Sequence, residues 1–202
     1  MSTRWLVCLT AVWLAAVAGS LAGVWRYKTT AGASAAAPTR WPEASGLARS
    51  AGRATLVMLA HPKCPCTRAS LHELEQLMTR LRQRATAHVL FITPAGGSRD
   101  WESGELYSRA QALPGVRVTT DPGGARASLF GAVVSGQTLV YDPAGKLLFA
   151  GGITAARGHE LCSAVVVTFM AALSGASPGS ALSSDVYGCE LMPGTAERQA
   201  AR

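Results

Sequence analysis

The pattern of hydrophobic and polar positions begins with a long apolar run. From Trp5 to Trp25 the chain reads WLVCLTAVWLAAVAGSLAGVW, without a charged residue. A helix of about 20 apolar residues can cross the hydrocarbon core of a membrane, and tryptophans at both ends suit the two interfaces. The pattern therefore predicts a transmembrane anchor over residues 1–28. A cleaved signal peptide is the alternative, but the run exceeds the usual h-region of about 7–15 residues.

The segment that follows, residues 29–52, is rich in Ala, Ser, Gly and Pro and lacks apolar periodicity. Such a composition is typical of a flexible linker. We therefore expect a tether here, then a folded domain over residues 53–176, and a polar C-terminal tail over residues 177–202.

Strand and helix patterns alternate along the predicted domain. ATLVMLA (54–60) and HVLFIT (88–93) are continuous apolar runs, typical of strands that are buried on both faces. Between them, leucines recur at steps of three and four residues, which predicts an amphipathic helix. The remaining expected elements are helices at 100–112, 123–132 and 158–175, a strand at 116–120, and two antiparallel strands within 137–153. The order β-α-β-α-β-α-β-β-α predicts an α/β domain in which helices flank a central mixed sheet.

Composition narrows the choice of partners. Apolar residues make up 49% of the chain and the mean hydropathy is +0.19, an excess that the N-terminal run explains. The 19 basic residues outnumber the 12 acidic ones, but they are scattered and few aromatic residues stand among them. This distribution disfavours nucleic-acid binding and is better explained by a solvated surface near anionic lipid.

The stretch HPKCPCTRAS (61–70) carries the candidate chemistry. Cys64 lies where the first strand gives way to a helix, and Pro65 suits the first helical position, where its missing N–H costs nothing. A thiolate at this place faces the positive end of the helix, which lowers its pKa, and Arg68 adds positive charge. With Cys66 beside it, such a thiol is suited to thiol-disulfide exchange.

The element order and the position of the two cysteines resemble the thioredoxin fold over residues 53–175. More narrowly, HPKCPCTRAS together with LVYDPAGKLLFAGGITAARGHE (139–160) resembles a bacterial, membrane-tethered thioredoxin-like family known as RedB. The resemblance implies an oxidoreductase in which Cys64 attacks and Cys66 resolves. It also implies that the partners are protein thiols or disulfides, or a redox partner protein.

The resemblance also suggests which residues surround the dithiol. Gly136 stands where thioredoxins carry a proline that helps to present substrate and to keep metals off the cysteines. The last strand of the sheet returns to the dithiol end, so we expect Arg157 and His159 there. His61, three residues before Cys64, belongs to the same predicted site.

Three further cysteines lie outside this motif. Cys189, in the tail, is a candidate third thiol, because the chain from Gly175 can extend over up to ~46 Å; return to the dithiol is allowed by this length but not required. Cys162 is expected to be a small core residue, with pairing to Cys189 as the rival interpretation. Cys8 lies in the predicted anchor and is expected to be inert.

Two functions of different classes remain open. The favoured one is a thiol-disulfide oxidoreductase without a cofactor. The alternative is a metal-binding or copper-delivery module, similar to Sco proteins, in which Cys64, Cys66 and one of His61, His159 or Cys189 hold Cu or Zn. A non-catalytic binding domain is a weaker third interpretation. We favour the first because the dithiol occupies an established redox position and no full set of metal ligands is evident near it.

The orientation of the anchor is ambiguous from charge. Arg26, Lys28 and Arg40 after the apolar run outnumber Arg4 before it, which favours a cytoplasmic domain by the positive-inside rule. Because long domains translocate largely regardless of nearby charge, we nevertheless expect a single-pass protein of the cytoplasmic (inner) membrane, with its domain facing the periplasm or the exterior.

Overall fold

The computed structural model describes residues 3–33, 36–81, 84–96, 104–158 and 181–192, and it divides the chain into two compact units, residues 1–30 and 31–202. The first unit is the helix α1 (Thr3–Thr29), which has no buried residues. Within the described part of the chain, α1 is the one helix whose length and composition would allow it to cross a membrane; a signal sequence meets the same test.

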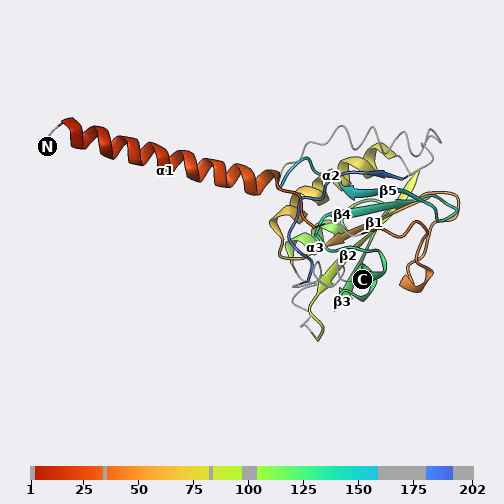
Figure 1. Ribbon diagram of the computed structural model, residues 1–202. Helices are drawn as coiled ribbons and strands as arrows, with labels where there is room; N and C mark the ends of the chain where they lie inside the picture. Colours follow the sequence, from red (N-terminus) through yellow and green to blue (C-terminus); the bar gives the residue numbers. More distant parts are fainter. Residues whose placement is uncertain (1–2, 34–35, 82–83, 97–103, 159–180, 193–202) are drawn as a thin grey trace. The chain divides into compact units, whose positions relative to one another are not determined.

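The second unit is built on a six-stranded sheet in the order β3-β2-β1-β4-β5-β6 (Figure 1). The strands are β1 (Ala54–Ala60), β2 (Ala85–Thr93), β3 (Val116–Pro122), β4 (Gln137–Tyr141), β5 (Leu147–Gly152) and β6 (Leu182–Ser183). The first three are parallel to one another, and β4 is antiparallel to both β1 and β5. This mixed sheet confirms the predicted thioredoxin-like fold class.

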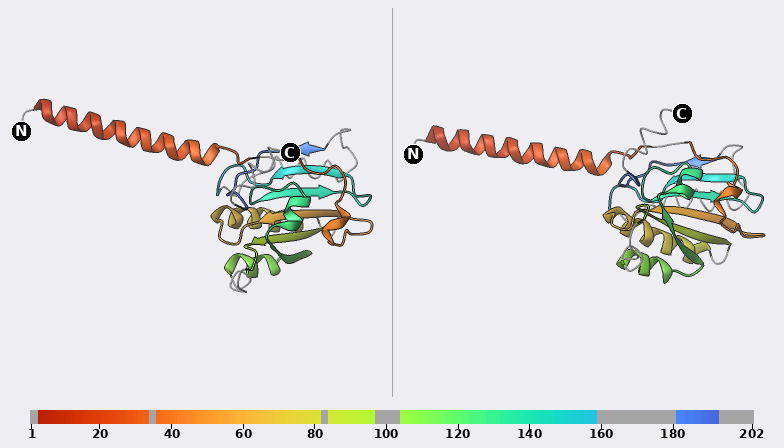
Figure 2. Two further views of the ribbon diagram at one scale, coloured as in Figure 1. Left: turned by 60° about the horizontal axis from the view of Figure 1, so that its bottom comes forward. Right: turned by 90° about the horizontal axis from the view of Figure 1, so that it is seen from below.

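Helices cover both faces of this sheet (Figure 2). On one face lie α2 (Pro65–Leu81) and α3 (Glu105–Gln111), and on the other lies α4 (Ala125–Leu129). Side chains alternate along β1, so that Leu56 and Met58 pack with α2 while Val57 and Leu59 pack on the other face. The continuous apolar run of β1 is therefore explained by burial on both sides.

The helix α4 is shorter than the ten residues predicted for it. Gly123, Gly124 and Gly131 have φ values of +73°, +70° and +65°. A left-handed residue cannot continue a right-handed helix, and glycine adopts this conformation without a Cβ clash. The glycines therefore restrict the helix to five residues.

The segment that we expected to be a flexible linker is packed on the domain. From Ala31 onward it belongs to the compact unit, and the side chain of Trp41 is only 5% exposed. The indole contacts the rings of Phe130 and Tyr141 edge-on, at centroid distances of 5.5 and 5.3 Å. The backbone N–H of Trp41 also donates to the carbonyl of Gly145 at 2.8 Å. One buried aromatic residue thus anchors a segment that has no apolar periodicity.

The C-terminal tail is likewise part of the sheet. After β6, which pairs with β5, it passes over Gly151 and Gly152 at the end of β5. A Cβ on Gly152 would lie 2.5 Å from the carbonyl oxygen of Asp185, so this crossing requires a residue without a side chain. The predicted last helix, with His159 and Cys162, falls outside the described residues apart from Gly158.

Candidate thiol site

Cys64 lies immediately before the first residue of α2, Pro65. Between the end of β1 and this helix, the N–H of Cys64 donates to the carbonyl of His61 at 3.1 Å, and the N–H of Thr67 donates to the carbonyl of Cys64 at 3.0 Å. The first of these bonds closes a tight turn, and the second ties Cys64 to the start of the helix. Cys66 follows in the first turn of α2. The local sequence therefore fixes both cysteines of the dithiol at a helix N-terminus.

The tail brings a third thiol to this place. The Sγ atoms of Cys64 and Cys189 lie 3.1 Å apart, although the two residues are 125 positions apart in the chain. The backbone of the tail pairs with the segment before β4: Ser135 donates its N–H to the carbonyl of Cys189, and Leu191 donates its N–H to the carbonyl of Val133, both at 2.8 Å. All three cysteines are free thiols.

Ionisation is distributed unequally over these thiols. The pKa of Cys64 is lowered to about 4, first by the hydrogen bond from the Cys66 side chain and then by the side chain and backbone N–H of Cys189, while burial opposes the shift. The same bond with Cys64, together with burial, raises the pKa of Cys66. Burial, followed by the bond with Cys64, raises the pKa of Cys189 to about 11. At neutral pH the cluster thus holds one thiolate, Cys64, and two thiols that donate to it.

Arg157 supplies the positive charge at this site. Its charge lowers the pKa of both Cys66 and Cys189, against the larger effects that raise them. Its guanidinium also donates a hydrogen bond to the carbonyl of Gly188, the residue before Cys189. Arg157 therefore both holds the tail and favours thiolate formation in the two protonated cysteines.

The other predicted site residues are placed differently. Arg68 is directed to the neighbouring helix, where it forms an ion pair with Glu105, and its charge is not among the causes of the lowered pKa of Cys64. His61 lies beside the dithiol; burial lowers its pKa, and the charge of Cys64 opposes that shift. His159 lies outside the described residues.

Gly136 lies beside the thiols at the start of β4. It has a φ of +90°, and its N–H donates to the carbonyl of Leu59, at the end of β1, at 2.7 Å. A Cβ at this position would lie 2.8 Å from the Oγ of Ser70 in α2. The conformation and the close approach of α2 therefore both favour glycine.

Two hydroxyl groups that support the site were not singled out from the sequence. The Oγ of Ser135 accepts a hydrogen bond from the N–H of His61 at 2.9 Å and shares a second one, also of 2.9 Å, with the Oγ1 of Thr67. Thr67 in turn donates to the carbonyl of His61 at 3.0 Å. This network joins the dithiol turn to the segment that binds the tail. In the sequence, the only sign of this hydrogen-bond network is the position of Ser135 beside Gly136.

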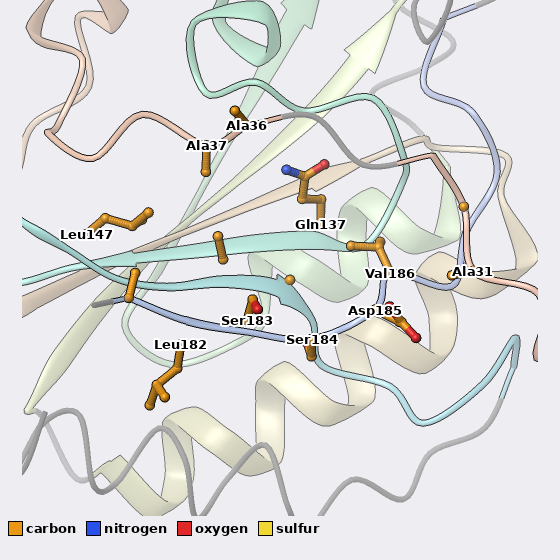
Figure 3. Close-up of a pocket in the computed structure, with 14 residues that line it drawn as sticks. Ala31, Ala36, Ala37, Gln137, Leu147, Leu182, Ser183, Ser184, Asp185 and Val186 are labelled. Atoms are coloured by element: carbon orange, nitrogen blue, oxygen red, sulfur yellow. The ribbon is translucent and has the colours of Figure 1, made fainter. Parts of the chain in front are cut away.

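No group of three His, Cys, Asp or Glu side chains among the described residues is arranged so that it could hold a metal ion. A cavity of about 750 Å³ lies between the linker, the strand pair β4–β5 and the tail (Figure 3). Small side chains such as Ala36 and Ser183 line it, with Gln137 at its wall, and its lining contains no cysteine or histidine.

No protein-family model and no curated protein matches the sequence. In structure, the chain is similar to a hypothetical protein from Sinorhizobium meliloti 1021, with 17% identity, a TM-score of 0.55, and coverage of 80% of this chain and 93% of that one. It is also similar to an uncharacterized conserved protein from Geobacillus kaustophilus, with 16% identity, a TM-score of 0.56, and coverage of 82% and 94%.

A secreted disulfide oxidoreductase from Mycobacterium tuberculosis is a more distant match, with 13% identity, a TM-score of 0.40, and coverage of 62% of this chain and 83% of that one. At these identities the likeness concerns the fold alone.

Proposed function

We propose that this protein is a membrane-tethered thiol-disulfide oxidoreductase in which Cys64 is the nucleophile. The observation that carries the proposal is the cluster of three thiols, with Cys64 immediately before α2, Cys66 in its first turn and the Sγ of Cys189 at 3.1 Å from that of Cys64. The pKa of Cys64, lowered to about 4 by its neighbours in this cluster, agrees with it. The thiolate is the reactive form of cysteine, and a second thiol in contact with it supplies the group that completes an exchange.

The reaction follows from the protonation states. The Cys64 thiolate attacks one sulfur of a substrate disulfide, forms a mixed disulfide and releases the first substrate thiolate. A second thiol of the cluster then attacks the Sγ of Cys64, breaks the mixed disulfide and releases the second substrate thiolate, to which its proton passes. Two thiols of the chain lose two electrons in total, and the substrate disulfide accepts them. The reverse sequence oxidises a substrate dithiol. The sequence assigns the resolving role to Cys66.

The tether and the location belong to the same proposal. The apolar helix α1 anchors the domain in the cytoplasmic membrane, facing the periplasm or exterior, where disulfide exchange is common. The RedB-like motifs at 61–70 and 139–160 support a bacterial protein of this type. Its partners are protein thiols or disulfides and a redox partner protein, and it requires no cofactor.

The test uses the full chain, purified in a mild detergent under reducing conditions and in buffers without added metal, so that any ion that the protein holds is retained. Insulin-disulfide reduction and the stoichiometry of bound copper and zinc are measured on the same sample. We expect exchange activity that Cys64→Ser abolishes and that Cys8→Ser, a matched substitution in α1, leaves unchanged. Retention of one metal equivalent without any exchange activity would overturn the proposal in favour of metal binding by Cys64, Cys66 and Cys189.

A further inference from the structure

We propose that Cys189, rather than Cys66, is the thiol that resolves the mixed disulfide on Cys64, and that the tail segment Val186–Leu191 is built to deliver it. This inference rests on the proposed function and names the catalytic partner within it. Four features of the structure support it: the docking of the tail, the glycines that permit this docking, the different freedom of the two candidate thiols, and the position of Arg157.

The docking of the tail is specific at the level of the backbone. The N–H of Ser135 and the carbonyl of Val133 bind the backbone on either side of Glu190, which forms an antiparallel bridge with Val134. The side chains of Val186 and Leu191, at the two ends of the segment, are buried, with 6% and 2% of their surfaces exposed. The segment is therefore held at both ends, with Cys189 between them and against Cys64.

Glycine makes this approach sterically feasible. A Cβ on Gly188 would overlap the carbonyl oxygen of Ser135, and one on Gly152 would crowd the backbone of Asp185. The tail therefore approaches the domain backbone very closely at the residue immediately before Cys189. Arg157 binds the carbonyl of that same residue, so the contacts concentrate where they position the thiol.

The two candidate thiols differ in their freedom to form a disulfide. A bond between Cys64 and Cys66 must bridge Pro65, whose φ is fixed, within the first turn of α2, and a disulfide tolerates only a narrow range of geometries. A bond between Cys64 and Cys189 requires the two Sγ atoms to close from 3.1 Å to about 2 Å. The tail segment is not helical, so this movement disrupts no helical turn.

The tail also controls access to the nucleophile. Cys64 is only 2% exposed while the tail is docked, so a substrate disulfide reaches it when the tail lifts. When the tail returns, Cys189 meets the mixed disulfide. The mixed disulfide carries no charge on Cys64, so one of the causes that raise the pKa of Cys189 is removed. The charge of Arg157, which lowers the pKa of Cys189, remains. Cys189 can then pass its proton to the leaving substrate thiolate.

The experiment follows one turnover of the full chain in detergent. Reduced protein is mixed with a limiting amount of oxidised glutathione, released glutathione thiol is counted, and disulfides are mapped by peptide mass spectrometry under non-reducing conditions. We expect the wild type and Cys66→Ser to release two thiols per oxidised glutathione and to contain a Cys64–Cys189 disulfide. Cys189→Ser is expected to release one thiol and to retain glutathione on Cys64.

A glycine pair tests whether the docked position of Cys189 matters. Gly188→Ala keeps the thiol but prevents its close approach, so it should accumulate the mixed disulfide at least ten-fold above the wild type. Gly104→Ala, where a Cβ meets nothing within 4 Å, should behave as the wild type. A wild-type Cys64–Cys66 or Cys162–Cys189 disulfide, or two thiols released by Cys189→Ser, would overturn the assignment while leaving the oxidoreductase function intact. Failure of the wild type to react at all would instead count against the proposed function.

Discussion

Replacing Cys66 by alanine tests the origin of the reactivity of Cys64. The hydrogen bond from Cys66 is the largest cause of the lowered pKa of Cys64, and Cys66→Ala removes the donor. A hydrogen bond to a charged group contributes about 1.5–3 kcal/mol, and about 1.36 kcal/mol corresponds to one pH unit. We therefore expect the midpoint of Cys64 ionisation to rise from about 4 by about 1–2 pH units.

This shift has a second consequence at neutral pH. Cys64 stays ionised at pH 7 in both proteins, but the nucleophilicity of a thiolate grows with its pKa with a Brønsted coefficient of about 0.4–0.5. The rise expected for Cys66→Ala therefore corresponds to alkylation that is about 3- to 10-fold faster at pH 7. Near pH 4 the same variant should react more slowly, because a smaller fraction of its Cys64 is ionised. The two rate profiles should consequently cross.

The assay is the rate of iodoacetamide reaction at Cys64 between pH 3 and pH 9, resolved by mass spectrometry of the peptide. Cys66→Ser is the matched control, because its hydroxyl keeps a donor at the same position and should leave the midpoint nearly unchanged. An equal shift in both variants would mean that packing, rather than the donated hydrogen bond, sets the pKa of Cys64. An unchanged midpoint in Cys66→Ala would refute the reasoning entirely.

Three further predictions concern stability and topology. Trp41→Ala should cost about 3–5 kcal/mol of unfolding free energy in urea, whereas Trp13→Ala in α1 should leave the unfolding of the domain unchanged. The pKa of Cys64 falls from 9.0 to about 4 on folding, so between these pH values the unfolded chain binds more protons than the folded one. The free energy of unfolding of the reduced wild type, relative to that of Cys64→Ser, should therefore grow from pH 5 to pH 8. This difference should vanish below about pH 4. The protein should resist carbonate extraction, and a reporter fused after Arg202 should be active outside the cytoplasm; a reporter active only inside it would reverse the topology.

The sheet was predictable because most of its strands have a recognisable local sequence pattern. The apolar runs at 54–60 and 88–93 correspond to β1 and to most of β2, and the hairpin within 137–153 corresponds to β4 and β5. Burial on both faces of a central strand requires such runs whatever surrounds them. Elements that depend on a few residues were harder to predict. The five-residue α4 is limited by flanking glycines, and the linker is held by the buried side chain of Trp41 together with backbone hydrogen bonds that leave no periodic signal.

Within the site, the dithiol could be placed from the local sequence and Arg157 from the direction of the strand before it. Cys64, Pro65 and Cys66 follow from the junction of a strand with a helix, so their place could be inferred without any long-range contact. Cys189 could not be placed, because chain length alone permits many positions for a tail. Its approach depends on backbone pairing with the segment at Ser135, and such pairing leaves no apolar or periodic signal in the sequence.

The protonation of the three thiols bears on the choice between stepwise thiol-disulfide exchange and binding of a metal ion by all three at once. The hydrogen bonds that stabilise the Cys64 thiolate are the same bonds that hold protons on Cys66 and Cys189, so each ionisation discourages the next. Thiol-disulfide exchange needs one thiolate at a time, first to attack and then to resolve. A soft metal ion needs its cysteine ligands deprotonated together and would have to displace both of these protons. In the metal-free cluster, the distribution of protons therefore suits one nucleophilic thiolate followed by one resolving thiol.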